Sequence, residues 1–273
     1  MPALNLDGTF ELTVEVVPPA GPDPGPLLQA LRGLHGLPFA AFSVATNPLA
    51  KPRLSALALS ALIQREVGRP AILHCTTRDH NRLSLQALLW GARALGIETV
   101  LVATGDFVAL GDQARTTTVR DVDVFGLVRM AREAGLQTGV VLDPHPEANG
   151  LEQAVQRLRR KAEAGAQFAV TQPVYDRAGA LALAEATADV GLPVFLGILP
   201  LRSARHAQFL HDKVAGISVP EAVRQRMAEV LNPAAEGVRL AREMLRLARE
   251  QFAGACLMPP FDRYEVVAEV LGP

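Results

Sequence analysis

The chain alternates short runs of β-forming residues with longer amphipathic segments, which is typical of parallel strands joined by crossover helices. We expect eight strands, near residues 10–17, 39–45, 70–75, 98–104, 138–143, 167–172, 193–198 and 214–219. Eight such units within about 220 residues favour a closed (βα)8 barrel, the TIM barrel, over an open α/β sheet. An open sheet remains the alternative, although G-x-G-x-x-G, P-loop and G-x-S-x-G motifs are all absent.

The segments between the predicted strands have helical spacing of apolar residues. Those at 54–68, 81–96, 123–135 and 151–165 end in glycine, as helix C-termini prefer. After Pro233 a long helical pattern covers 234–252, and a shorter one follows Pro260. We expect both to pack outside the barrel, as a C-terminal helical extension from about residue 233. No linker rich in Gly, Ser or charge interrupts the pattern, so residues 1–273 are expected to form one domain.

Charge and cysteine content narrow the function classes. The 27 basic and 28 acidic residues are interspersed, which argues against binding to nucleic acid or an anionic membrane and favours a small-molecule substrate. Cys75 and Cys256 give no disulfide framework, and the first ten residues lack a signal-peptide pattern, so we expect a cytoplasmic protein. No run of about 18 apolar residues could span a bilayer.

The first predicted strand places a carboxylate at the catalytic end of the barrel. Its residues Leu12, Val14 and Val16 suit the surrounding helices, and this turns Thr13 and Glu15 toward the interior. At the strand end Glu15 would be partly desolvated, which favours the protonated form and supplies a general acid near neutral pH. The alternative is a structural Glu paired with a nearby Arg.

Two further strand ends carry polar groups. The fourth strand ends in Thr104-Gly105-Asp106, where Gly permits close approach of a ligand and Asp supplies a fixed charge. The sixth ends near Gln172, whose amide suits the edge of a heterocycle. Asp106 could equally cap a helix or form a turn, and Gln172 could be a buried structural residue.

A metal site was weighed because possible ligands follow two strands: His74, Cys75, Arg78 and Asp79 after the third, and Asp143 and His145 after the fifth. None of these groups has the spacing of a known metal motif. His206 and His211 are five residues apart and would not share a helical face. We therefore expect no metal.

Several segments, in order, resemble the methylenetetrahydrofolate reductase family, especially the reductase half of bacterial proteins fused to a homocysteine methyltransferase domain. The likeness covers about residues 10–225 and includes VEVVPP, HCTTRDHN, LGIETVLVATGD, KAEAGAQFAVTQPVYD and GILPLRSARHAQFLHDKVAGISVP. It implies a βα-barrel with FAD across the strand ends, in one-carbon metabolism and methionine biosynthesis. The implied reaction reduces 5,10-methylenetetrahydrofolate to 5-methyltetrahydrofolate, with NADH or NADPH as co-substrate.

The resemblance also implies site residues. Glu15 takes the place of the family's general acid, Asp106 that of the Asp beside flavin and folate, and Gln172 that of the Gln that holds the pterin. His206 and Leu210 stand where relatives carry a folate-contacting Gln and Phe, so substrate contact is expected with altered chemistry.

Flavin contacts follow from the same match: Thr46, Asn47, His74, Thr104, Gly105, Asp106, Asp121, Asp123, His145, Ala148 and Lys161. For Lys161 the alternative is a solvated helix charge. Two differences from the family's pattern lower the expected strength of FAD binding. The segment after the fifth strand, Leu142–Glu147, is shorter than in many relatives and lacks their Tyr, and Ala154 replaces an acidic contact.

Two rival functions stay open. One is a reductase that passes hydride directly from the nicotinamide to the folate without flavin. The other is a non-catalytic folate-binding subunit of a larger reductase or methyltransferase complex. Apolar surface on the C-terminal helices could build a homo-oligomer. The sequence leaves open NADH or NADPH preference, reaction direction and polyglutamate preference.

Overall fold

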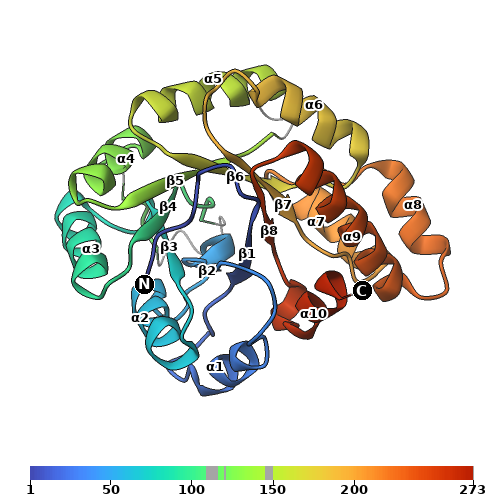
Figure 1. Cartoon of the computed structure of the whole chain (residues 1–273), viewed down its shortest axis with the longest axis horizontal. Coiled ribbons are helices and arrows are strands. Elements are labelled where there is room, and N and C mark those ends of the chain that lie inside the picture. The colour runs from blue at the N-terminus through green and yellow to red at the C-terminus, as the bar shows by residue number, and fades with distance from the viewer. Residues whose placement is uncertain (109–115, 120, 145–149, 273) are drawn as a thin grey trace.

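The computed structural model shows a closed barrel of eight parallel strands surrounded by helices (Figure 1). The structure describes residues 1–108, 116–119, 121–144 and 150–272. The strands are β1 (Glu11–Val16), β2 (Ala41–Val44), β3 (Ala71–Thr76), β4 (Thr99–Ala103), β5 (Gln137–Leu142), β6 (Phe168–Pro173), β7 (Val194–Ile198) and β8 (Gly254–Leu257). The expected fold class is confirmed.

The α-helices follow the strands in chain order around the outside of the barrel (Figure 1). They are α1 (Gly25–Arg32), α2 (Ala56–Leu62), α3 (Arg82–Ala94), α4 (Val124–Glu133), α5 (Gly150–Glu163), α6 (Arg177–Thr187), α7 (Ala204–Lys213), α8 (Glu221–Glu229), α9 (Pro233–Gln251) and α10 (Glu265–Leu271). Short helical turns are η1 (Pro48–Ala50), η2 (Ile63–Val67) and η4 (Pro260–Asp262).

The prediction of an eighth strand at 214–219 is wrong, whereas the other seven strands lie where the sequence predicted them. Residues 214–219 link α7 to α8, and Ile217 and Val219 are buried in an apolar cluster with residues of those helices. Their apolar character therefore serves helix packing. The true last strand, β8, pairs in parallel with both β1 and β7 and closes the barrel.

The region after residue 233 contains the expected helices and, in addition, this closing strand. The long helix α9 packs against β7 and β8 from outside, and α10 packs against α9. The C-terminal part of the chain thus belongs to the barrel wall as well as to its surroundings.

The two faces of β1 are as predicted. Leu12, Val14 and Val16 join the apolar cluster that includes helix residues such as Leu28. Thr13 is buried on the other face, and its hydroxyl donates to the carbonyl of Ala255 in β8 at 3.4 Å. The alternation of strand β1 therefore directs Glu15 inward, on the same face as Thr13.

Helix ends explain much of the polar pattern between strands. The glycines expected to end four helices, Gly68, Gly96, Gly135 and Gly165, all have positive φ. Helices begin at side chains that accept a hydrogen bond from the backbone N–H three residues later: Ser55, Asn81, Asp123, Asp176, Ser203 and Asn232.

Two phenylalanines fill the interior of the barrel toward the strands' amino ends. The rings of Phe168 and Phe195 lie 5.5 Å apart, and a methyl group at Gly139 or Gly254 would collide with them. Leu4 belongs to the same cluster, and its backbone exchanges two hydrogen bonds with the Gln137 side chain, each 2.9 Å long. This packing leaves the carboxyl ends of the strands for chemistry.

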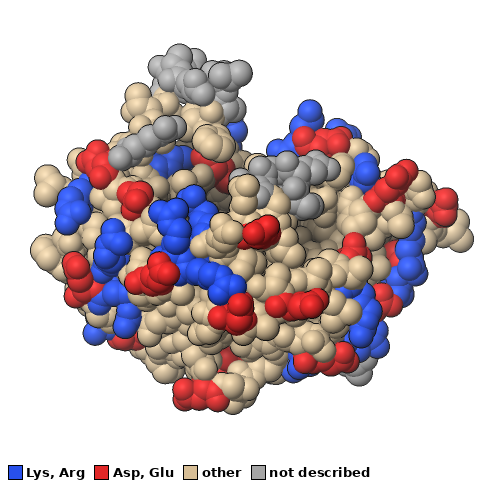
Figure 2. Space-filling view, turned by 90° about the horizontal axis from the view of Figure 1, so that it is seen from above, with Lys and Arg blue, Asp and Glu red and all other residues tan. Residues whose placement is uncertain are grey.

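Charges of both signs alternate over the face that Figure 2 shows, with Lys and Arg groups lying next to Asp and Glu groups. Within the described ranges, no helix has the length and apolar character needed to cross a membrane.

Gly237 in the middle of α9 offers a test of the packing. A methyl group there would collide with the backbone of Leu201, so we expect Gly237→Ala to lower the free energy of unfolding by about 2 kcal/mol or more. Helix propensity alone predicts the opposite sign, a gain of up to about 1 kcal/mol. Urea denaturation measures the change. The matched control is Gly91→Ala in α3, whose new methyl would meet only the Leu57 side chain at 3.4 Å. Equal, small effects of the two changes would contradict the packing.

Candidate active site

Three of the predicted site residues lie at the same rim of the barrel. Glu15 and Gln172 are the penultimate residues of β1 and β6, and Asp106 follows the end of β4. All strands run parallel in one closed barrel, so their carboxyl ends share this rim. The structure thus brings together groups that are far apart in the sequence.

Glu15 lies deep among protein atoms at this rim, although part of its surface still reaches solvent. Burial and, to a smaller extent, the negative charge of Asp106 together raise the pKa of its carboxyl to about 7. The alternative of a Glu paired with an Arg would have lowered this pKa. Glu15 therefore has the properties of a proton donor near neutral pH.

Asp106 is exposed but fixed in position. Its Oδ2 accepts a hydrogen bond from the backbone N–H of Leu49 at 2.6 Å, and its carbonyl accepts one from Arg78 Nη1 at 3.2 Å. Among the described residues, the next α-helix along the chain, α4, begins at Asp123 and not at Asp106. The strand β4 loop is thereby tied to the loop after β2, and the carboxylate remains within electrostatic range of Glu15.

Arg78 connects three strand-end loops. It is buried and pairs with Asp79 at 2.5 Å, and its Nη2 donates to the carbonyl of Asn47 at 3.1 Å. The Asn47 amide in turn donates to Asp79 Oδ2 at 3.1 Å. In the sequence Arg78 and Asp79 were considered only for a metal site. Their role in the structure is to fix the loops after β2, β3 and β4 around Asp106.

His74 lies within β3. The interpretations as a metal ligand or flavin contact had placed it after this strand. Its Nε2 shares a hydrogen bond with the hydroxyl of Ser43 in β2 at 2.7 Å. Burial lowers the pKa of His74 to about 4, so the imidazole is neutral at physiological pH. Ser43 was missed in the sequence because a single buried Ser in an apolar strand carries no motif.

Gln172 lies where β6 departs from regular pairing. The register between β6 and β7 shifts between Val170 and Pro173. The hydroxyl of Thr171 bridges the irregularity, since it donates to the Gln172 carbonyl at 2.8 Å and accepts from the Gly197 N–H at 2.8 Å. The half-buried Gln172 side chain is thus carried on a fixed backbone at the rim.

Gly105, after the end of β4, packs closely against side chains that follow and end β3. Gly105 has φ +89, and a methyl group there would lie 3.1 Å from Arg78 Cβ and 3.2 Å from Thr76 Cβ. Thr76 Oγ1 beside it is buried and has no hydrogen-bond partner in the part of the chain that the structure describes. These side chains account for the glycine, whereas the unsatisfied Thr76 hydroxyl near exposed Thr104 fits a bound group such as a flavin.

Other residues expected to contact a flavin have structural partners. Asp123 begins α4 by accepting from the Gly126 N–H at 2.6 Å, and Asp121 accepts from the Arg82 N–H at 3.3 Å at the start of α3. Thr46 is half-buried in the loop after β2, beside Asn47. The expected contacts His145 and Ala148 lie outside the described residues.

Lys161 is not a solvated helix charge. Its side chain is buried against β5, where Nζ donates to the carbonyl of Val141 at 2.5 Å. The pKa of the amine is lowered to about 8, because burial and the charge of Arg157 outweigh the opposite effect of Asp143. The amine of Lys161 thus lies below the strand-end loops.

The two predicted substrate contacts in α7, His206 and Leu210, differ in polarity and in surroundings. His206 is buried at the start of α7, its ring 4.7 Å from the ring of Phe261, and its Nδ1 accepts from the Arg202 N–H at 3.3 Å. Burial and the charge of Arg202 lower the pKa of His206 to about 4. Leu210 is buried in the apolar cluster under α7 and α8.

The sequence reasoning missed the contribution of β8 and its following loop. Burial raises the pKa of Cys256 to about 12, and Glu15 contributes to this rise. Burial also raises the pKa of Tyr264, with further contributions from Asp262 and Glu15. Both residues therefore lie near the Glu15 carboxyl. A signal was present, because Leu257-Met258-Pro259-Pro260 repeats the strand-then-Pro-Pro pattern that ends β1.

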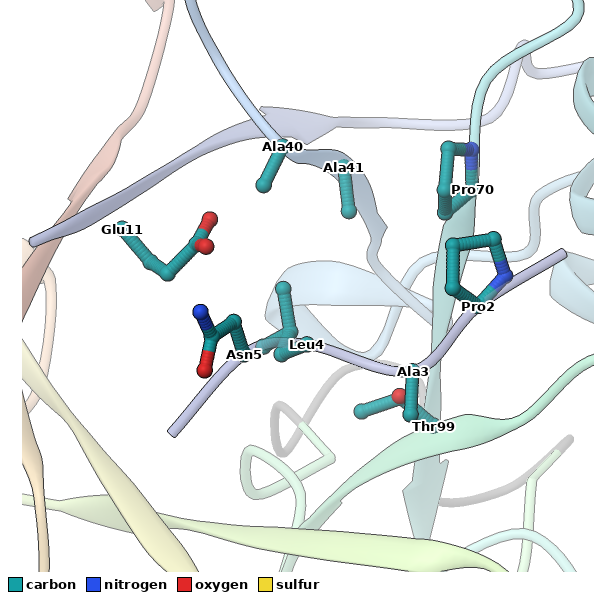
Figure 3. A pocket seen from close by; sticks show the side chains of 9 residues that line it. All are labelled: Pro2, Ala3, Leu4, Asn5, Glu11, Ala40, Ala41, Pro70 and Thr99. Carbon is teal, nitrogen blue, oxygen red and sulfur yellow. The ribbon is translucent and has the colours of Figure 1, made fainter. Parts of the chain in front are cut away.

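A pocket of about 270 Å³ at the opposite end of the barrel is no rival site. It lies between the N-terminal segment and the starts of β1, β2 and β4, with Glu11 facing Asn5 across it (Figure 3). Glu11 is its single ionisable side chain, and Leu4, which plugs the barrel, lines it. Among the described residues no cluster of three or more His, Cys, Asp or Glu side chains could hold a metal ion.

Comparison with known proteins identifies related sequences. The model of the methylenetetrahydrofolate reductase family matches residues 3–251. The chain is 26% identical over 196 residues to 5,10-methylenetetrahydrofolate reductase of Salmonella typhimurium, covering 69% of this chain and 64% of that protein. It is 22% identical over 171 residues to the probable methylenetetrahydrofolate reductase (NADPH) of Caenorhabditis elegans, covering 61% of this chain and 26% of that one. These matches therefore span less than two thirds of either relative.

Solved structures support the fold alone. A mutant tryptophan synthase alpha-subunit from Pyrococcus furiosus superposes with a TM-score of 0.57 at 15% identity, covering 98% of this chain and 99% of that chain.

The raised pKa of Glu15 predicts a specific pH dependence of stability. The folded protein holds this proton more tightly than the unfolded chain does, so the stabilisation is complete below pH 4.5 and is lost as the pH rises through about 7. Between pH 5 and 8, wild type should lose on the order of 2 to 3 kcal/mol relative to Glu15→Gln. Urea denaturation at both pH values measures the difference. Glu185→Gln, which removes an exposed carboxyl from α6, is the control and should follow wild type. A Glu15→Gln curve parallel to wild type would refute the raised pKa.

Proposed function

The chain belongs to the methylenetetrahydrofolate reductase family, and on that premise we propose that it reduces 5,10-methylenetetrahydrofolate to 5-methyltetrahydrofolate, with bound FAD and with NADH or NADPH as the hydride source. The observation that carries the proposal is a carboxyl with a pKa of about 7, Glu15, beside a fixed carboxylate, Asp106, at the open rim of the barrel. The oxidoreductase reaction needs a proton and a nearby negative charge at one place, and these two residues supply them.

Glu15 acts as the general acid. The five-membered ring of the substrate must open to an iminium cation before a hydride can reach its methylene carbon, and a proton from Glu15 assists that opening. A donor with a pKa near the working pH is protonated often enough and still acidic enough to transfer its proton.

Asp106 stabilises the positive charge that develops on the opened substrate. Its hydrogen bonds to Leu49 and Arg78 hold it in place beforehand, so little reorganisation is needed when the charge appears. The same negative charge raises the pKa of Glu15 and so helps keep its proton available. Asp106 therefore acts both on Glu15, which donates the proton, and on the substrate, which accepts it.

Substrate recognition falls to Gln172 and His206. The amide of Gln172 can donate and accept, which suits the edge of a pterin, and the irregular end of β6 holds it at the rim. His206 is neutral, with its Nδ1 accepting a backbone N–H, so its Nε2 carries the hydrogen and serves as a donor. Leu210 contributes apolar packing beneath.

FAD, when bound, would accept hydride from the nicotinamide and deliver it to the methylene carbon. The unsatisfied Thr76 hydroxyl and exposed Thr104 support its place after β4. Asn47 and His74, fixed by Asp79 and Ser43, would line the same region. The ammonium of Lys161 donates to the Val141 carbonyl and has further N–H donors for a ligand.

An absorption spectrum of the freshly purified protein tests whether the protein binds a flavin. A yellow protein that NADH or NADPH bleaches and methylenetetrahydrofolate recolours supports the proposal. Turnover by a colourless protein would instead indicate direct hydride transfer, and folate binding without turnover would indicate a non-catalytic subunit. We also propose that the protein forms a homo-oligomer and is located in the cytoplasm.

The role of Glu15 predicts a split between the two half-reactions. Glu15→Gln should slow reoxidation by methylenetetrahydrofolate about 100-fold or more, because the proton donor is lost, and leave reduction by the nicotinamide within about threefold. Anaerobic stopped-flow measurement of each half-reaction gives both rates. Glu11→Gln, on the same face of the same strand but at the plugged end, should change neither. Equal losses in both half-reactions of Glu15→Gln would exclude the assigned role.

A further inference from the structure

Phe261 is an unusual residue in this chain. Its side chain is 69% exposed, and its backbone is left-handed with φ 55 within the short turn η4 that follows β8. Left-handed backbone is rare for a bulky side chain, and exposure of a large ring to water is unfavourable. A structural role in the core does not explain the residue, since most of its ring packs against nothing in the described part of the chain.

The part of the ring that is supported rests on His206. The two ring centroids lie 4.7 Å apart with the planes inclined by 51°. The imidazole is buried and, because its pKa is lowered to about 4, it is neutral and suits contact with an apolar ring. This tilted contact with His206 and the exposure of the rest of the ring leave Phe261 presented at the surface.

The turn that carries Phe261 lies beside the proposed proton donor. β8 pairs with β1, with Leu257 opposite Val14, so the residues after Leu257 continue at the same rim as Glu15. Tyr264, three residues beyond Phe261, lies within electrostatic range of Glu15. Asp262 faces Arg53 from the loop after β2. Phe261 is therefore at the mouth of the site and not on a remote surface.

The position on α7 where the resemblance implies an aromatic contact with folate offers no ring. Position 210, where relatives carry a folate-contacting Phe, holds a Leu that is only 6% exposed and is packed in the cluster under α7 and α8. Leu210 therefore cannot present a ring to a substrate. Phe261 lies outside the residues matched by the family model, 3–251, and reaches the same helix through its contact with His206.

We propose that Phe261 is a substrate-binding residue of this site, on which a flat conjugated ring of a reactant stacks. The ring bound is the p-aminobenzoyl or pterin group of the folate or the nicotinamide of NADH or NADPH. All are planar, and both reactants enter the same mouth under the proposed function, on which this inference rests.

The test compares Phe261→Leu with Phe209→Leu, which removes another exposed ring, from the surface of α7. Calorimetric titration with 5-methyltetrahydrofolate gives Kd, and the steady-state KM for each reactant shows which ring is bound. We expect Phe261→Leu to raise Kd or KM for one reactant about three- to tenfold, the size of one aromatic contact, with kcat within about twofold. Phe261→Tyr should restore wild-type values, and Phe209→Leu should match wild type.

The outcomes show whether the ring that stacks on Phe261 comes from the folate or from the nicotinamide cofactor. A change confined to the folate constants identifies the folate ring, and one confined to the nicotinamide KM identifies the nicotinamide. Unchanged constants for both reactants, or an equal loss in Phe261→Tyr, would overturn the inference. The calorimetric arm needs no turnover, so a protein that binds folate through Phe261 without reducing it would refute the proposed function and leave this inference standing.

Discussion

Closure of the barrel by β8 is the constraint on which the site depends. This strand has only Gly254, Ala255, Cys256 and Leu257, yet it pairs with β1 on one side and β7 on the other. Small side chains are needed because a methyl group at Gly254 would meet the ring of Phe195. Without β8, the edge of β1 would be open to water, and Glu15 would lose the desolvation that raises its pKa.

One end of the barrel contributes mainly to stability, and the other end carries the polar groups proposed for the chemistry. Toward the amino ends of the strands, Phe168, Phe195 and Leu4 fill the interior with apolar contacts. At the other rim the side chains are polar, and buried Arg78 holds the loops after three strands together. Packing at one end thus allows the charges at the other to be fixed in place, which is what an electrostatic mechanism requires.

Most of the fold could be predicted from periodicity, since seven strands have strong β-forming runs bounded by helical segments. The eighth failed because a four-residue strand of small residues has a weak pattern, whereas the apolar run at 214–219 imitates a strand. For the site, the alternation along β1 sufficed to place Glu15. It could not show that Asp123 would begin α4, that Lys161 would be buried, or that Phe261 would meet His206, because each depends on contacts between distant segments.

The central claim is that Glu15 keeps its proton near neutral pH because it is buried close to Asp106. Titration of the Glu15 carboxyl by carbon-13 NMR on glutamate-labelled protein, with Glu15→Gln to identify the resonance, measures this directly. The account predicts a pKa of about 7 in wild type and a lower value in Asp106→Asn. A wild-type carboxyl that titrates at its ordinary value of 4.5, or one that Asp106→Asn leaves unchanged, would contradict it.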